Sequence, residues 1–257
     1  MALNIKEDAF VEQFALQGDE KTKPQGISTS KNVTGIEVRL SRAFIINNKT
    51  PKIGPFPGFS KMYLMVVVVS DTGDVLQNLD LKSFAKVGDD EDLPVDKTIY
   101  FWKQQQKKDK SPSQIHVLAS IVKSKQSLRD VAKILADVKN DSEYADVVSS
   151  IKEVVRNAAA VTQISDLLFS VAAVVGKFLG KVDDKPLLTW VQSFTDINGD
   201  FDKLGKTTIG RKNDFAALDL SIIIRDTHRE IELASLQNAV IEELEIAKVG
   251  EISNKLP

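Results

Sequence analysis

Segments of alternating apolar and polar residues fill most of the first 125 positions of this 257-residue chain. Ile36, Val38 and Leu40 alternate with polar side chains, which is the period-two pattern of a half-buried strand. The run at 62–69 is almost wholly apolar and β-branched, which indicates a central strand covered on both faces. Because short turns separate five such segments, the sequence predicts an antiparallel β-sandwich rather than βαβ units.

The periodicity changes to that of a helix after Ser127. From residue 147 onward, apolar residues recur every seven positions, as they do on one face of a long helix or of a broken pair of helices. We therefore expect a helical hairpin at roughly residues 126–182, ending near Gly180 and inserted between two strands. The strand pattern returns at 187–194 and again at 215–224.

These patterns divide the chain into three parts. Residues 1–34 combine a short amphipathic patch with a polar run, which is typical of an N-terminal arm or linker. Residues 35–225 contain the predicted sandwich and its insertion, so the fold class is mainly β with an α insertion (α+β). Residues 226–257 are expected to begin as a strand and to continue as a helix, which gives a helical C-terminus.

Composition excludes several classes of function. The 34 basic and 36 acidic side chains give a formal charge of −2, so there is no basic field for nucleic acid. The absence of cysteine excludes disulfides, thiolate metal sites and cysteine nucleophiles. The N-terminal residues lack the order of a signal peptide, and no apolar run reaches the ~18 residues of a membrane span. We expect a cytoplasmic protein or one exported by a non-classical route.

An acidic loop at 196–210 carries the clearest candidate site. Asp196, Asn198, Asp200 and Asp202 place four side-chain oxygens at every second position, and calcium prefers such ligands. The helix-loop-helix calcium motif does not fit, because Phe201 stands where that motif requires glycine. The competing interpretation is an ordinary solvated turn in which Asn198-Gly199 supplies a positive φ angle.

The same loop resembles a known family. Asp-Phe-Asp-Lys-Leu-Gly-Lys-Thr-Thr-Ile-Gly at 200–210 resembles the third calcium loop of C2 domains, the calcium-dependent lipid-binding β-sandwiches. Phe-Ser-Lys-Met-Tyr-Leu-Met-Val at 59–66 is similar to the family's Ser-Asp-Pro-Tyr-Val segment. The resemblance covers only the β segments. It places Lys61 at the family's first-loop aspartate and Thr207 or Thr208 at its late third-loop aspartate, which implies a lost or incomplete calcium site.

The sequence disfavours an enzyme. His116 alternates with apolar residues in a predicted strand, so we expect it on a sheet face or in the core. His228 stands among charged residues and is expected on the surface. No serine or threonine lies in a nucleophile elbow, and no glycine-rich loop with a lysine precedes a helix. Grouped carboxylates occur only in runs typical of solvated loops.

Two further segments are candidates for contact with a lipid or a protein partner. The first is the lysine-rich turn with Lys103, Lys107, Lys108 and Lys110, which suits an anionic surface but is also typical of a solvated loop. The second is the apolar helix at 158–179, with Leu168, Phe169 and Phe178 as contact residues. The favoured interpretation of that helix is a buried one, packed on its neighbour or on the sandwich.

Three hypotheses for function follow from these features. The leading one is a non-enzymatic binding module that acts on a membrane surface or a protein partner through the sandwich loops and the inserted helices. The second is a membrane-perturbing, toxin-like protein in which the 158–179 helix inserts into the bilayer. The third is a structural subunit of an oligomer or larger assembly, whose 1–34 arm becomes ordered on a neighbour.

Overall fold

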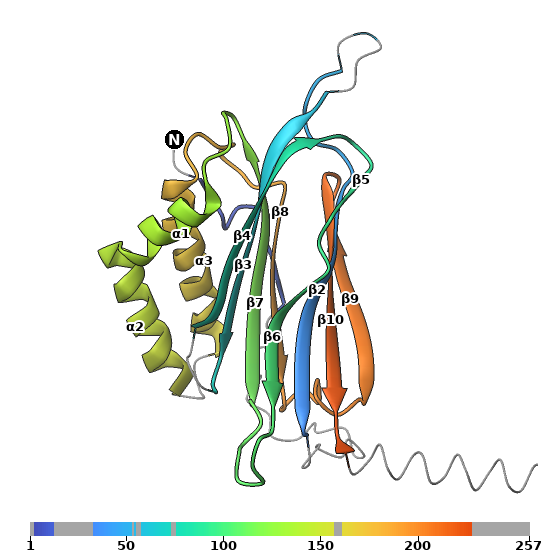
Figure 1. The fold of residues 1–257 in the computed structure, drawn as a ribbon, viewed down its shortest axis with the longest axis vertical. Helices are drawn as coiled ribbons and strands as arrows, with labels where there is room; N and C mark the ends of the chain where they lie inside the picture. The colour runs from blue at the N-terminus through green and yellow to red at the C-terminus, as the bar shows by residue number, and fades with distance from the viewer. Residues whose placement is uncertain are drawn as a thin grey trace, which may run out of the picture.

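Two β-sheets and three helices make up the computed structural model, which describes residues 3–12, 33–52, 54, 58–72, 76–156 and 161–227 (Figure 1). The strands are β1 (Phe10–Glu12), β2 (Gly35–Ile45), β3 (Ser60–Ser70), β4 (Leu76–Val87), β5 (Glu91–Leu93), β6 (Lys97–Lys103), β7 (Gln114–Ser124), β8 (Leu188–Thr195), β9 (Gly205–Lys212) and β10 (Ala216–Arg225). The helices are α1 (Val131–Lys139), α2 (Ser142–Arg156) and α3 (Val161–Phe178).

The strands form two sheets that face each other. Sheet A has the order β1-β8-β7-β3-β4. Sheet B has the order β5-β2-β10-β9, and β6 pairs with β2 beside β5. All pairs are antiparallel except β1 with β8. The prediction of a mainly antiparallel, two-sheet protein with a helical insertion is confirmed.

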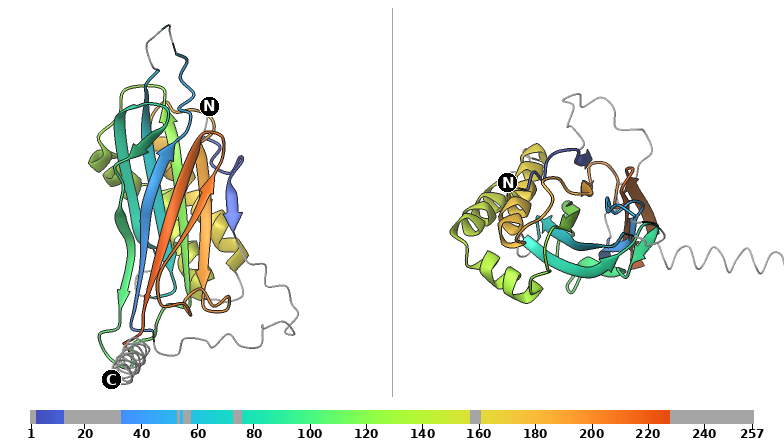
Figure 2. Two further views of the ribbon diagram at one scale, coloured as in Figure 1. Left: turned by 90° about the vertical axis from the view of Figure 1, so that its right-hand side faces the viewer. Right: turned by 90° about the horizontal axis from the view of Figure 1, so that it is seen from above.

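Sheet A is the middle of three layers, because both of its faces are apolar. Met62, Leu64, Val66 and Val68 of β3 belong to the core shared with sheet B. Tyr63, Met65, Val67 and Val69 belong to the core shared with the helices. The end view in Figure 2 shows the helices gathered on one side of the sheets. The prediction that 62–69 is a central strand covered on both faces is therefore correct.

The insertion lies where the sequence predicted it, between β7 and β8, and it contains three helices, as expected if the second half of the hairpin is a broken pair. The Asp130 side chain caps α1 by accepting a hydrogen bond from the Lys133 amide at 3.1 Å. The Asp141 carboxylate accepts the Tyr144 amide at 3.2 Å and so begins α2. After α3, Gly180 adopts a φ of +87°, which ends the helix near the predicted place.

The N-terminal residues are partly built into the fold. Ile5 is buried among the helices, and β1 pairs in parallel with β8 from Trp190 to Gln192. Within the predicted 1–34 arm, residues 10–12 therefore belong to sheet A and Ile5 belongs to the helical core. The predicted helical C-terminus and His228 lie outside the described residues. Among the helices that the structure describes, none has the length and apolar content to cross a membrane.

Candidate functional site

One end of the sandwich collects most of the residues that the sequence singled out. We call it the lower end, as Figure 1 draws it; it consists of the turn at 104–113 between β6 and β7, the loop at 196–204 between β8 and β9, and the adjoining ends of β2, β6, β9 and β10. The two segments are joined because the Asp196 amide donates a hydrogen bond to the Ser113 carbonyl at 3.0 Å. The turn at 104–113 also carries the chain from sheet B to sheet A.

The acidic loop is shorter than the sequence suggested and is closed by its own contacts. Its second half, from Gly205 onward, is strand β9. The Asp200 carboxylate accepts the Thr195 amide at 2.7 Å, and Gly199 supplies a φ of +75°. Phe201 is only 3% exposed and anchors the loop in the core between the sheets. These are the features of the turn interpretation, with Asn198-Gly199 at its corner.

The acidic loop holds three carboxylates near one another that do not form a metal-binding group. In the part of the chain that the structure describes, no three His, Asp or Glu side chains are grouped so as to hold a metal ion. Burial raises the pKa of Asp196 and of Asp200, and the neighbouring Asp202 carboxylate acts in the same direction on both. Asp196, Asp200 and Asp202 are therefore not grouped as metal ligands in this structure.

The prediction that Lys61 places a positive charge at the cation site is wrong. Lys61 is paired with Ser124 at the start of β3, whereas the strand ends that flank the acidic loop are Gln114 and Thr195. Because β3 runs the length of sheet A, Lys61 lies at the opposite end from Asp200 and does not affect a cation there. Thr207 and Thr208 lie within β9 rather than in a loop, and the Thr208 hydroxyl is bonded to that of Ser221 at 2.8 Å.

Basic side chains at the lower end point outward, while most of its carboxylates are engaged. Its exposed cations are Lys103, Lys107, Lys108, Lys110, Lys203, Lys206 and Arg225. Asp109 accepts the amides of Gln105 and Gln106 at 3.0 and 2.8 Å. Asp71 accepts both the amide and the hydroxyl of Ser113. The four predicted contact lysines of the 103–110 turn are thus free to meet an anionic surface.

Two apolar side chains protrude at this end. Ile197 is 66% exposed and Phe101 is 64% exposed, more than any other large apolar residue that the structure describes. Ile197 lies in the acidic loop beside the lysine-rich turn. Phe101 borders a hollow of about 560 Å³ on β2, β6 and β10, whose lining also includes Lys103 and Arg225. Sequence reasoning missed both residues, because exposure depends on the packing of distant strands.

The three predicted contact residues of the helices lie in the core or against it. Leu168 is fully buried and Phe169 is 5% exposed, and both belong to the core between the helices and sheet A. Phe178 is partly buried against the same core. None of the three forms a surface in this structure, which agrees with the buried interpretation of the helix.

His116 lies in the helix-facing surface of sheet A, 1% exposed, as expected for a sheet-face or core residue. Its Nδ1 is 2.8 Å from the Ser193 hydroxyl, and its Nε2 is 3.1 Å from Oε1 of Gln114. Gln114 in turn donates to the Val155 carbonyl of α2 at 3.3 Å. Burial lowers the pKa of His116 to about 4. His116 is therefore neutral near pH 7, and its hydrogen bond to Gln114 connects sheet A to α2.

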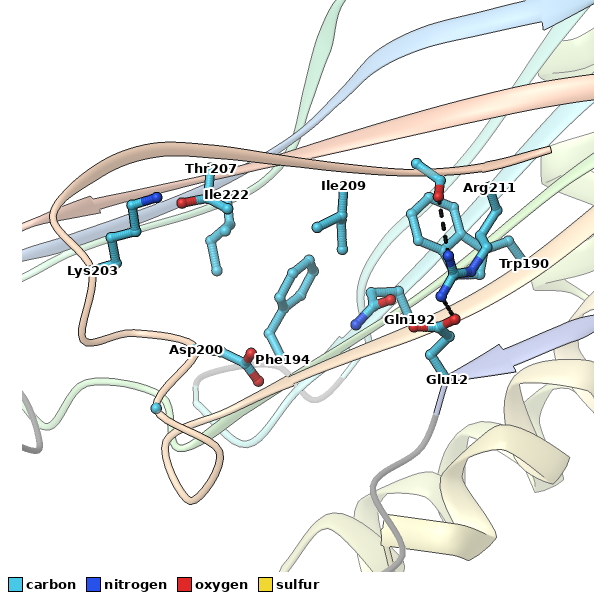
Figure 3. Close-up of a pocket in the computed structure, with 12 residues that line it drawn as sticks. Glu12, Trp190, Gln192, Phe194, Asp200, Lys203, Thr207, Ile209, Arg211 and Ile222 are labelled. Atoms are coloured by element: carbon cyan, nitrogen blue, oxygen red, sulfur yellow. Dashed lines mark hydrogen bonds and ion pairs between the residues drawn. The ribbon is translucent and has the colours of Figure 1, made fainter. Parts of the chain in front are cut away.

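A cavity of about 490 Å³ opens between the sheets beside β8 and β9 (Figure 3). Trp190, Gln192 and Phe194 of β8 face Thr207 and Ile209 of β9 across it, as Figure 3 shows. The acidic loop contributes Gly199, Asp200 and Lys203 to its mouth. An ion pair between Arg211 and Glu12 closes the other side. In the described part of the chain, β1 pairs with three residues of β8 at this edge of the sandwich.

Two buried polar atoms of the lining residues have no hydrogen-bond partner among the described residues: Nε1 of Trp190 and Oε1 of Gln192. Trp190 is 1% exposed and Gln192 is 8% exposed. Sequence reasoning missed them, although one signal was present: strict alternation along 187–194 places Gln192 between two aromatic residues on one strand face. Comparison with protein-family models, with curated proteins and with solved structures found no significant match to this chain.

Proposed function

We propose that this chain is a non-enzymatic binding module, a C2-like β-sandwich that attaches to anionic membrane surfaces through its lower end. The observation that carries this proposal is the pairing of the two most exposed large apolar side chains, Ile197 and Phe101, with a group of outward-facing lysines. The resemblance of 200–210 to a C2 loop supports the same type of ligand.

The physical basis is the addition of two weak attractions. Each lysine or arginine close to an anionic leaflet contributes about 1 kcal/mol of binding free energy at physiological ionic strength. An exposed apolar side chain adds binding free energy when it enters the boundary between headgroups and acyl chains. The lower end provides both, because Lys107 and Lys108 lie exposed in the turn that is hydrogen-bonded to the loop of Ile197.

The contact surface in this proposal consists of the sandwich loops and not of the inserted helices. The apolar face of α3 is already occupied by sheet A and α2. A membrane-perturbing activity would therefore require α3 to leave its core, at the cost of exposing Leu168 and Val171. Release of dye from vesicles would support that alternative, whereas binding without release supports the module. A protein partner is the remaining alternative and would leave vesicles unbound.

The first prediction concerns the lysine-rich turn. Replacing both Lys107 and Lys108 with glutamine should weaken binding to vesicles of phosphatidylserine and phosphatidylcholine by about 30-fold, because two contributions of about 1 kcal/mol are lost. Co-sedimentation of the full chain with vesicles, at constant ionic strength, measures the change. Calcium is added in one series and omitted in another, so that any role of the acidic loop is recorded separately.

The matched control carries the same change of charge elsewhere. Lys133 and Lys152 are exposed on α1 and α2, in the helical layer. The double replacement K133Q/K152Q should leave vesicle binding within twofold of the original chain. Equal losses in the two double variants would contradict the assignment of the lower end, and absence of binding by the original chain would contradict the lipid proposal altogether.

A further inference from the structure

We propose that the hollow on β2, β6 and β10 binds a soluble aromatic phosphate, that is, a flat ring that carries a phosphate monoester. The phosphate would lie between Lys103 and Arg225, and the ring would lie against Phe101. The volume of about 560 Å³ is within the range of about 300–1,000 Å³ that is usual for sites of small molecules. The inference concerns a soluble ligand and does not rest on the proposed membrane attachment.

Strand pairing sets the shape of the hollow. Gly35 of β2 is the register partner of Lys103 on β6 and of Arg225 on β10. Their strand neighbours Ile36 and Ile224 face the core shared with sheet A, so these three residues belong to the outer face of sheet B. Figure 2 turns this sheet towards the viewer in its left panel. A residue without a side chain therefore stands between two cations on strands about 10 Å apart.

The groups around this floor are suited to an anion. The Lys103 ammonium and the Arg225 guanidinium are exposed and can only donate hydrogen bonds. The hydroxyls of Thr34 and Thr227, which also line the hollow, are 3.2 Å apart, so one of their two protons remains for a ligand. A phosphate monoester carries about −1.5 to −2 charges at pH 7 and three acceptor oxygens, so it can accept from both sides of the floor.

The next row of the sheet provides an apolar place for the ring. Glu37 of β2 is the register partner of both Phe101 and Ile223. Phe101 is 64% exposed, so its ring can be reached from solvent. The Glu37 carboxylate accepts hydrogen bonds from Arg39, at 3.0 Å, and from the Thr98 hydroxyl, which compensates its charge. A flat aromatic group beside Phe101 would bury apolar surface and stack on its ring.

Three probes separate the ring from the phosphate. 2-Naphthyl phosphate has both groups, methyl phosphate has only the phosphate, and 2-naphthol has only the ring. Titration of the ¹⁵N-labelled full chain at constant ionic strength follows the amide resonance of Gly35, which lines the hollow. 2-Naphthyl phosphate should shift this resonance in a saturable way, and each of the other two probes should bind at least tenfold more weakly.

Three variants assign the two contacts. Phe101→Ala should weaken 2-naphthyl phosphate about tenfold and leave methyl phosphate nearly unchanged, because only the first probe stacks. Lys103→Gln should weaken both phosphates about fivefold through the loss of an exposed ion pair. Lys212→Gln is the matched control, since Lys212 is exposed at the other end of β9, and it should change neither affinity.

A dispersed amide spectrum confirms the folding of each variant. Equal affinities for 2-naphthyl phosphate and methyl phosphate, or equal losses in K103Q and K212Q, would overturn the inference. Glycerophosphoserine, the soluble headgroup of phosphatidylserine, is the fourth probe. If it shifted Gly35 at lower concentrations than 2-naphthyl phosphate, the hollow would be a lipid headgroup site and not a site for an aromatic phosphate. Vesicle binding without a response to 2-naphthyl phosphate would contradict this inference alone.

Discussion

Replacing Leu168 with alanine is expected to lower the free energy of unfolding by about 3 kcal/mol, within the usual range of about 2–5 kcal/mol for such a change in a core. Leu168 of α3 has no exposed surface and lies in the core between the helices and sheet A. Truncation removes buried methyl groups and leaves a cavity between α3 and sheet A. These packed elements can close that cavity only in part. Urea unfolding of both chains, followed by circular dichroism, measures the difference.

Ile197→Ala is the control for this prediction, because Ile197 is large and aliphatic but 66% exposed. Its effect on unfolding should stay within about 0.5 kcal/mol, as for most surface substitutions. A loss below about 1 kcal/mol for L168A would mean that α3 is not part of the cooperative core. The helix would then be available for partner or membrane contact, contrary to the structure described above.

The second large effect is a dependence of stability on pH that originates at His116. Burial lowers its pKa from 6.5 to about 4 in the folded chain, so the unfolded chain binds the proton more tightly between these values. The stability that depends on neutral His116 is therefore fully present above pH 6.5, and it is lost as the pH falls towards 4. The expected loss from this single group between pH 7 and pH 4 is about 3 kcal/mol.

Measuring unfolding at a series of pH values tests the assignment to this residue. His116→Gln removes the titrating ring but retains hydrogen-bonding groups for Ser193 and Gln114. This variant starts from a lower stability at pH 7 but should lose about 3 kcal/mol less on acidification than the original chain. Parallel curves for the two proteins would show that carboxylates, and not His116, determine the acid sensitivity.

Much of the fold could be predicted from residue patterns. The continuous apolar run at 62–69 indicated a strand buried on both faces, and β3 is such a strand. The switch to helical spacing after Ser127 placed the insertion between β7 and β8. The sequence left open whether one long helix or a broken pair follows α1, because no glycine or proline occurs from 142 to 175 to mark the break between α2 and α3.

The candidate site was harder to predict, because it depends on strand pairing. The family pattern matched 59–66 and 200–210 separately, yet the pairing of Lys61 with Ser124 puts the first segment at the far end of sheet A from the acidic loop. Local similarity contains no information about that register. The same is true of the cavity, since its walls come from β8, β9 and β10 and from Glu12, which are far apart in the sequence.

The most direct test of membrane attachment uses the absence of cysteine from the chain. Ile197→Cys and, as a control on α2, Ser149→Cys each create one thiol that can carry an environment-sensitive nitrobenzoxadiazole dye; both positions are exposed. With phosphatidylserine-containing vesicles, emission from the dye at position 197 should shift to the blue, while the dye at position 149 should not respond. A response at 149 with none at 197 would contradict attachment through the lower end.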